Sequence, residues 1–198
     1  MNFLAHAYLS FGHPEMLLGN MISDFVKGKK QFDYPENVQR GISLHRFIDT
    51  FTDEHPATRS IKQFFKPKYG KYSGAFADVV YDYFLANDNQ SFEDETLLSV
   101  FATNTYTLLS QQAHLFPSHF ELVFQNMQQQ NWLLNYGKKW GIEKSFGGLV
   151  RRAKYLDDPR PAFSIFENNL FALKQLYDDF FPAVKQYALD KIESFKNM

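Results

Sequence analysis

The sequence predicts an all-α protein built as a single compact domain. Its apolar residues recur at helical spacing almost throughout, and no segment alternates strictly between turn residues as a strand would. The chain has 198 residues, close to the size of one domain, and 44% of them are hydrophobic, enough for a sizeable core. No repeat, low-complexity tract or Pro/Ser-rich linker divides it, so we expect residues 1–198 to form one domain.

Proline and glycine mark the expected helix ends, because proline favours the first turn and glycine the position after the last. Ser73 is a plausible N-cap, residues 66–71 are expected to form a basic loop, and 137–148 is the segment with the weakest order. Pro182 is a candidate break in the last helix. After an apolar opening helix that carries His6, the expected helices are 14–27, 35–55, 57–65, 73–86, 93–112, 118–135, 146–155 and 163–195.

The most informative stretch runs from His45 to Pro56. It places His45, Asp49 and Asp53 at intervals of four on one helix, where such residues are neighbours. A stripe of nitrogen and oxygen groups can bind a divalent cation that activates water. His45 and Asp49 lie in line with Val38 and Ile42, away from the polar side of the helix, which indicates a semi-buried cleft. The alternative is a salt-bridged helix end.

Other helices also place acidic or imidazole groups among apolar residues. Asp78 and Asp82 lie four apart on a helix that is apolar nearly all round, and Asp24 lies on the stripe that begins with Leu17. A buried carboxylate without partners is costly, so each needs a metal, a cation or several hydrogen-bond donors. An arginine or the amides of a helix N-terminus would serve equally well. His6, taken alone, is more typical of a hydrogen-bonded core residue.

Composition excludes several classes of site and of protein. The chain has no cysteine, so disulfides, thiolate metal sites and a cysteine nucleophile are ruled out. It contains neither a P-loop nor a Gly-x-Ser-x-Gly elbow. No apolar run approaches the ~20 residues that span a bilayer, and the first residues do not read as a signal peptide. We therefore expect no membrane partner and, by default, a cytoplasmic location.

The net charge of −1 conceals an uneven distribution. Residues 27–72 contain ten Lys or Arg against five acids, whereas residues 73–137 contain seven acids and no Lys or Arg. The basic third could steer an acidic partner toward the protein. Nucleic acid is disfavoured, because the domain as a whole is not basic. An unevenly charged, solvated surface is the simpler interpretation, and the oligomeric state is not predicted.

Four motifs, in this order and at this spacing, resemble the acyl carrier protein phosphodiesterase family, also called acyl carrier protein hydrolases. They are MNFLAH (1–6), LGNMISDFVKG (18–28), GISLHRFIDTFTD (41–53) and DVVYDYFL (78–85). The resemblance implies an all-α fold similar to metal-dependent HD-domain phosphohydrolases. It also implies hydrolysis of the phosphodiester that links 4′-phosphopantetheine to a serine of holo-acyl carrier protein, with Mn²⁺, or else Mg²⁺, as cofactor.

The resemblance also implies residue roles. The family's motif residues carry over as metal ligands to His6, Asp24, His45, Asp49 and Asp82. Asp24 and Asp49 are also expected to be catalytic. Asp53 is expected either to orient water as a catalytic residue or to have a structural role only. Substrate contacts are expected from Arg46, Lys27, Lys30 and Tyr83.

Tyr83 is a departure from the family pattern, which usually reads Asp-His-Phe-Leu where this chain has Asp82-Tyr83-Phe84-Leu85. If the family's histidine is a ligand, this chain has altered chemistry or none; if it lies behind the ligands, a phenol could supply a similar hydrogen bond. Lys27, Lys29 and Lys30, with Lys62, Lys66, Lys68 and Lys71, are expected to form a docking face for the acidic carrier protein. The competing hypotheses are a metal phosphohydrolase acting on a small phosphodiester or nucleotide, and a non-catalytic carrier-protein binding module.

Overall fold

The structure is a computed structural model that describes residues 1–196, and every regular element in that range is helical. This confirms the all-α prediction. None of the helices in residues 1–196 is long and apolar enough to cross a bilayer. The α-helices are α1 (Phe3–Tyr8), α2 (Pro14–Ile22), α3 (Glu36–Glu54), α4 (Pro56–Tyr69), α5 (Ser73–Ala86), α6 (Glu95–Ser110), α7 (Ser118–Gln129), α8 (Trp132–Asn135), α9 (Lys139–Arg152), α10 (Arg160–Asn168) and α11 (Leu170–Lys196). Four 3₁₀ turns connect them, namely η1 (Ser23–Phe25), η2 (Gly28–Asp33), η3 (Gly70–Tyr72) and η4 (Ala113–Leu115).

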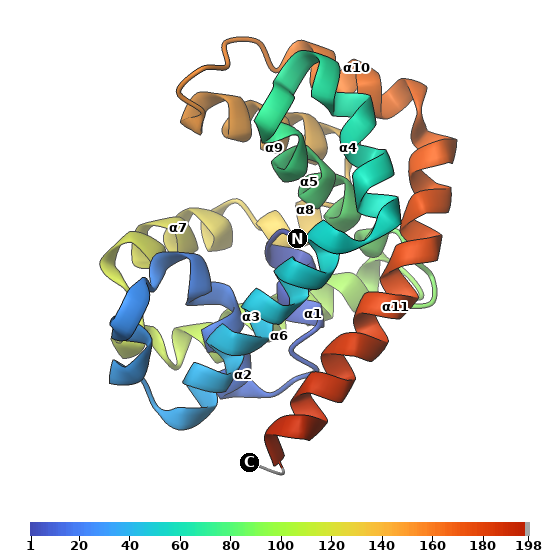
Figure 1. Cartoon of the computed structure of the whole chain (residues 1–198). Helices are drawn as coiled ribbons and strands as arrows, with labels where there is room; N and C mark the ends of the chain where they lie inside the picture. Colours follow the sequence, from blue (N-terminus) through green and yellow to red (C-terminus); the bar gives the residue numbers. More distant parts are fainter. Residues whose placement is uncertain (197–198) are drawn as a thin grey trace.

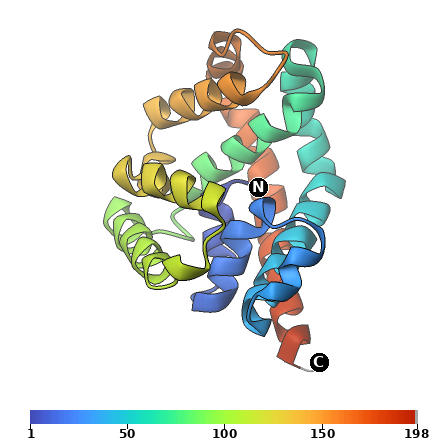
Figure 2. The same ribbon diagram turned by 90° about the vertical axis from the view of Figure 1, so that its left-hand side faces the viewer.

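The long helix α11 supports the others from one side. It packs against α3, α4 and α5 and runs along the molecule (Figure 1). Aromatic rings fill much of the interface, and Tyr81 of α5 stacks on Phe180 of α11 with centroids 4.3 Å apart. The view turned by 90° shows α6, α7 and α9 on the opposite side of the central helices from α3 and α4 (Figure 2). The many phenylalanines are therefore mainly core residues, as aromatic side chains commonly are.

Helices α2 and α3 form the tightest pair in the molecule, and they carry most of the candidate site. Their backbones touch at Gly19 and Gly41, where neither residue has a side chain to hold them apart. A Cβ on Gly19 would collide with the carbonyl oxygen of Val38 and lie 2.7 Å from the Ile42 nitrogen. A Cβ on Gly41 would collide with the carbonyl oxygen of Met16. The two glycines thus set the distance between the helices.

Several predicted helix ends are wrong because burial overrides local signals. The predicted loop over 66–71 is mostly helix, since α4 continues through Pro67 to Tyr69. Phe65 and Tyr69 are buried and hold this last turn, with the Tyr69 ring stacked on Phe76 at 4.2 Å. The helix then ends at Gly70, whose φ of +50° suits glycine.

The segment predicted to be least ordered, 137–148, is also largely helical, because α9 begins at Lys139. Ile142 and Phe146 are fully buried at a spacing of four and anchor its first turns. In the last third of the chain the break falls at Asn169, between α10 and α11, whereas Pro182 lies inside α11 between the buried Phe181 and Val184.

Three smaller differences concern helix ends. The predicted helix over 14–27 ends at Ile22 and passes into η1. The helix predicted over 118–135 is divided at Asn131, which has a left-handed φ of 45°. Ser73 begins α5 as its first residue and makes no capping hydrogen bond, so its predicted N-cap role is wrong.

Candidate metal centre

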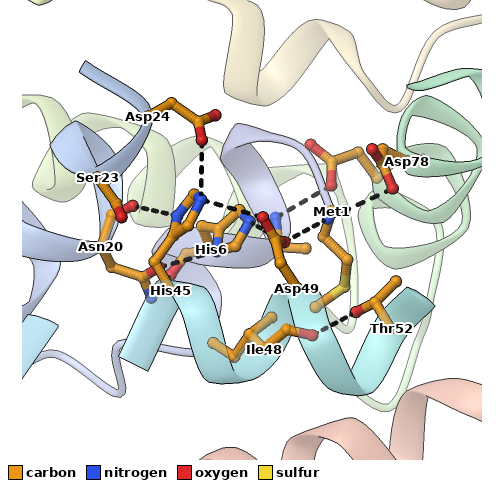
Figure 3. A network of polar contacts seen from close by, with 12 residues as sticks. Met1, His6, Asn20, Ser23, Asp24, His45, Ile48, Asp49, Thr52 and Asp78 are labelled. Atoms are coloured by element: carbon orange, nitrogen blue, oxygen red, sulfur yellow. Dashed lines mark hydrogen bonds and ion pairs between the residues drawn. The ribbon is translucent and has the colours of Figure 1, made fainter. Parts of the chain in front are cut away.

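Three ligand-type side chains from two helices meet beside the first residue of the chain. His6 comes from α1, and His45 and Asp49 come from α3, one turn apart. Each offers a nitrogen or oxygen atom, and these atoms all lie within 4.8 Å of one another (Figure 3). The four-residue spacing on α3 thus brings His45 and Asp49 together as predicted, and α1 adds His6.

Asn20 of α2 fixes the orientation of the His6 ring. Its side-chain nitrogen donates to the His6 carbonyl oxygen at 2.9 Å and to the Ser10 hydroxyl at 3.1 Å. The side-chain oxygen of Asn20 therefore faces Nδ1 of His6, 2.8 Å away, and must accept a hydrogen bond from it. With its proton on Nδ1, a neutral His6 carries its lone pair on Nε2.

The backbone of the same residue fixes His45. Nδ1 of His45 lies 2.7 Å from the carbonyl oxygen of Asn20, which can only accept a hydrogen bond. Nδ1 is therefore the donor, and a neutral His45 also carries its lone pair on Nε2. Asn20 is completely buried, so both histidines are held from inside the protein by one residue.

Both Nε2 atoms point at carboxylate oxygens without making a hydrogen bond. Nε2 of His6 lies 3.2 Å from Oδ1 of Asp49, and Nε2 of His45 lies 3.1 Å from Oδ2 of Asp49 and 3.3 Å from Oδ1 of Asp24. Both nitrogens are buried and have no hydrogen-bond partner. Two lone pairs that face carboxylates in this way repel them unless a cation or proton lies between. Two imidazoles and a carboxylate are a donor set that suits Mn²⁺, Fe²⁺ or Zn²⁺.

The charges in the cluster shift its pKa values in opposite directions. Burial and the neighbouring His45 lower the pKa of His6 to about 4, against the pull of Asp49. Burial also lowers the pKa of His45, but the carboxylates of Asp24 and Asp49 outweigh it and raise that pKa to about 9. Contact with His45 lowers the pKa of Asp24. One imidazole is thus held neutral, and the carboxylates are held ionised.

An open cleft adjoins the cluster on the side of η1. Its lining contains His45 and Asp49, together with the solvent-exposed carboxylates of Asp24 and Asp53. Asp24 reaches His45 from η1, whereas Asp53 makes an ion pair with Lys62 at 2.6 Å. Asp24 therefore contacts the cluster through His45, and Asp53 lines the cleft while paired with Lys62.

The α-ammonium group of Met1 completes the polar network. It lies 3.0 Å from Oδ1 of Asp49 and 3.3 Å from Oδ1 of Asp78 (Figure 3). Although burial alone would favour the neutral acid, this ammonium and the two histidines lower the pKa of Asp49 well below its usual range. Asp78 thus meets a cation of the chain itself, which is one of the partners that the sequence required of it.

Asp82 lies outside the three-residue cluster. It is completely buried, and its two oxygens accept hydrogen bonds from the backbone N–H groups of Leu4, at 2.8 Å, and Ala5, at 3.2 Å. These are donors of the first turn of α1, which have no partner within the helix. Burial raises the pKa of Asp82 to about 7 despite these bonds. Asp82 therefore anchors the short helix that carries His6, which is the amide alternative considered for it above.

The predicted substrate contacts fall into two groups. Lys27 and Arg46 line the cleft, Lys30 is exposed in the neighbouring η2, and Arg46 donates to the side-chain oxygen of Gln31 at 2.6 Å. Tyr83 does not line the cleft; its ring packs edge-on against Phe166 at 4.9 Å. The position at which this chain departs from the family pattern thus faces α10 rather than the cluster.

The lysines expected to form one docking face are spread over several elements. Lys27 lines the cleft and Lys62 pairs with Asp53 of its lining, whereas Lys66 and Lys68 lie in the last turn of α4. The single docking face stays a prediction.

Asn20 is the site residue whose role the sequence did not reveal. The available signal was an amide side chain among apolar residues, between Gly19 and Met21 on a buried helix. A buried polar group must be hydrogen-bonded, but its partners lie on two other helices, so the sequence alone does not identify them.

Comparison with known proteins identifies a matching family. The description of the matching family is acyl carrier protein phosphodiesterase, and the match covers residues 1–184. A curated relative of that name from Serratia proteamaculans is 30% identical over 191 residues, covering 96% of this chain and 99% of the relative. A relative of the same name from Yersinia enterocolitica is 29% identical and covers 96% of this chain and 99% of the relative. Another, from Photorhabdus laumondii, is 28% identical and covers 98% of this chain and 96% of the relative. No solved structure matches the chain, so the likeness to HD-domain phosphohydrolases stays a prediction. Because the family match extends over nearly the whole chain and includes His6, Asn20, His45 and Asp49, the chain belongs to the acyl carrier protein phosphodiesterase family.

Proposed function

We propose that this chain is a metal-dependent phosphodiesterase acting on holo-acyl carrier protein. The bond cleaved would be the phosphodiester between 4′-phosphopantetheine and the carrier serine, giving apo-acyl carrier protein and free 4′-phosphopantetheine. The names of the relatives support the substrate. The observation that supports a bound metal is the pair of buried Nε2 atoms, on His6 and His45, that face Asp49 without a hydrogen bond.

The residues present fit a divalent cation. His6, His45 and Asp49 would hold it, and Asp24 is near enough to contribute a further oxygen. A bound metal of this kind lowers the pKa of water and polarises a phosphoryl oxygen. We expect Mn²⁺, with Mg²⁺ as the alternative; two imidazole donors favour the former, because Mg²⁺ prefers an all-oxygen environment.

The protein's own groups would prepare the ligands and orient the substrate. Asn20 holds both imidazoles with Nε2 toward Asp49, and such outer partners set the orientation and basicity of histidine ligands. The exposed carboxylate of Asp24 stays ionised beside His45 and can accept a proton from water at its free oxygen. Lys27 and Arg46 line the cleft where the phosphodiester would enter, so their charges can contact its oxygens.

The direct test is incubation of the purified protein with holo-acyl carrier protein and Mn²⁺, followed by mass spectrometry of the carrier. We expect loss of the phosphopantetheine mass, abolition by a chelator, and restoration by added Mn²⁺. Asp49→Asn keeps the shape of the side chain but removes a ligand charge, so the rate should fall by about 100-fold or more. Asp157→Asn, on an exposed carboxylate remote from the cluster in sequence, is the matched control and should behave as the parent.

Two outcomes would reject the proposal. Turnover of an aryl phosphodiester without any loss of mass from holo-carrier protein would favour the small-phosphodiester hydrolase. Binding of the carrier protein with neither bound metal nor product would favour the binding module.

A further inference from the structure

A second hollow lies between the start of α1, the loop before α8, and α9. We call it the aromatic pocket. It is distinct from the cleft, since no residue lines both. The residues that matter for its chemistry are three aromatic side chains and three cations, namely Phe3, Trp132, Trp140, Lys144, Arg151 and Arg152.

Aromatic rings form one wall of the pocket. The rings of Phe3 and Trp132 have centroids 6.1 Å apart, and Trp140 is 53% exposed. An exposed tryptophan beside a concave surface is typical of a binding site, because contact with a ligand removes its large apolar ring from water. Asn135 and Ser145 add polar groups beside these rings. The pocket therefore suits a slim chain that alternates apolar and amide groups.

The cations of the pocket have no acidic partners of their own. Within residues 1–196, neither Lys144 nor Arg151 nor Arg152 makes an ion pair. Both arginines extend back over α9, where their guanidinium nitrogens would be 3.5 to 3.8 Å from a Cβ on Gly147 or Gly148. They are thus available to donate hydrogen bonds to carbonyl or phosphate oxygens of a ligand.

The aromatic pocket begins one residue away from the metal cluster. Asn2 and Phe3 line it and directly follow Met1, whose ammonium contacts Asp49. On the other side Val79 lines it, next to Asp78, the second partner of that ammonium. Consecutive Cα atoms are 3.8 Å apart, so only the first residues of the chain separate the pocket from the cluster.

We propose that the aromatic pocket receives the pantetheine arm of the substrate while the phosphodiester lies at the cluster. This inference rests on the function proposed above and adds to it a binding site for the part of the substrate that leaves. The arm is an extended chain with two amides and a terminal thiol. Its alkyl segments would lie against Phe3 and Trp132, and its carbonyl oxygens would meet Asn135 and the cations.

The chain offers a spectroscopic test, because its two tryptophans, Trp132 and Trp140, both line this pocket. Pantetheine, which has no phosphate, is titrated into the metal-loaded protein while tryptophan emission is recorded. We expect a saturable change in emission, and none with inorganic phosphate alone. The signal depends on occupancy and not on turnover, so it is independent of the hydrolysis assay.

A bulky replacement inside the pocket provides the mutational test. Ser145→Phe, half-buried in the middle of α9, should remove the pantetheine signal and raise KM for holo-carrier protein by about tenfold or more, equivalent to about 1.4 kcal/mol of binding. Ser164→Phe, the same change on the exposed face of α10, is the matched control and should keep both. Unchanged Mn²⁺ binding by Ser145→Phe shows that the fold has survived.

The outcomes separate this proposal from the one on which it rests. An emission change in the parent that Ser145→Phe abolishes and Ser164→Phe retains supports the pocket. No emission change at millimolar pantetheine, or an unaltered KM in Ser145→Phe, overturns it, even if holo-carrier protein is hydrolysed. If pantetheine binds but the carrier is never cleaved, the assigned reaction fails while the pocket stands.

Discussion

The imidazole rings of His6 and His45 lie face to face, with their centroids 3.9 Å apart and their planes within 13° of parallel. Two imidazolium ions cannot be stacked so closely in a buried site without strong repulsion. The pKa of His6, lowered to about 4 by burial and by its neighbour, agrees with a pair that carries at most one proton at neutral pH. The stacked geometry therefore suits a pair in which a single proton, or a bound cation, lies between the Nε2 atoms and Asp49.

Asn20→Ala should weaken metal binding although it removes no ligand. The substitution deletes the acceptor that holds the proton on Nδ1 of His6, so that ring is free to rotate or to change tautomer. Loss of such an outer partner typically costs 10–100-fold in metal affinity, and we expect about that loss for Mn²⁺ by calorimetry.

Ser10→Ala is the matched control for Asn20→Ala. It removes a hydrogen bond to the amide nitrogen of Asn20 but leaves both contacts to imidazole nitrogens in place. Its Mn²⁺ affinity should remain near that of the parent. Equal affinities for Asn20→Ala and the parent would mean that the two histidines do not form the metal site.

Gly19→Ala should disturb the site through the helix packing. The added methyl group collides with the carbonyl oxygen of Val38 and pushes α3, which carries His45 and Asp49, away from α2. Overpacking of this kind costs about 1–3 kcal/mol, so urea unfolding should show a lower stability, and Mn²⁺ affinity should fall with it.

Gly147→Ala tests whether any glycine replacement would act in the same way. Here the nearest atom to the new Cβ is a flexible arginine nitrogen at 3.7 Å, and the residue lies within α9. Alanine is about 1 kcal/mol better than glycine inside a helix, so this variant should be as stable as the parent or more so. A destabilised Gly147→Ala with an unaffected Gly19→Ala would contradict the close-approach argument.

The features that the sequence predicted correctly are those that depend on the spacing of residues along one helix. The helical fold follows from apolar periodicity, and the pairing of His45 with Asp49 follows from their separation by four residues. The partner of Asp82 could not be chosen from sequence, because a metal, an arginine and helix amides all satisfy a buried carboxylate. The structure selects the amides of Leu4 and Ala5, which lie 78 and 77 residues away along the chain.

Three of the wrong predictions have a common physical origin. Pro67, Pro182 and the glycines of α9 each weaken a helix locally. In each place buried residues outweigh that local cost, since tertiary packing supplies most of the stability of a protein helix. Local rules therefore located the helices well and their ends poorly.

Charge reversal near the cleft should slow the reaction with an acidic carrier protein. Lys27→Glu with Lys30→Glu reverses the field where the substrate would enter, so we expect kcat/KM at low salt to fall by about tenfold. The difference should shrink in high salt, because screening weakens exposed charges. Lys66→Glu with Lys68→Glu, an equal reversal at the far end of α4, is the control. Equal effects of the two pairs, or no dependence on salt, would argue against docking at the cleft.

His55 should make the protein less stable in mildly acidic solution, independently of the metal. It caps α4, because its Nδ1 accepts a hydrogen bond from the backbone N–H of Ala57 at 3.2 Å. An imidazolium cannot accept that bond, and burial beside Phe51 and Phe180 lowers the pKa of His55, against the pull of Asp179. Because the folded pKa lies below the unfolded value of about 6.5, the unfolded chain binds the proton more readily. Stability is therefore complete above pH 6.5 and is lost as the pH falls from there through the folded pKa.

His55→Asn isolates this contribution, since asparagine caps helices well and does not titrate. The difference in unfolding free energy between parent and variant should be nearly constant above pH 7 and should shift in favour of the variant between pH 6.5 and 5, by up to the cost of a lost cap, about 1 kcal/mol. Chemical denaturation at a series of pH values, with a chelator present to remove metal effects, measures it. Parallel pH profiles for the two proteins would show that the His55 side chain does not cap the N-terminus of α4.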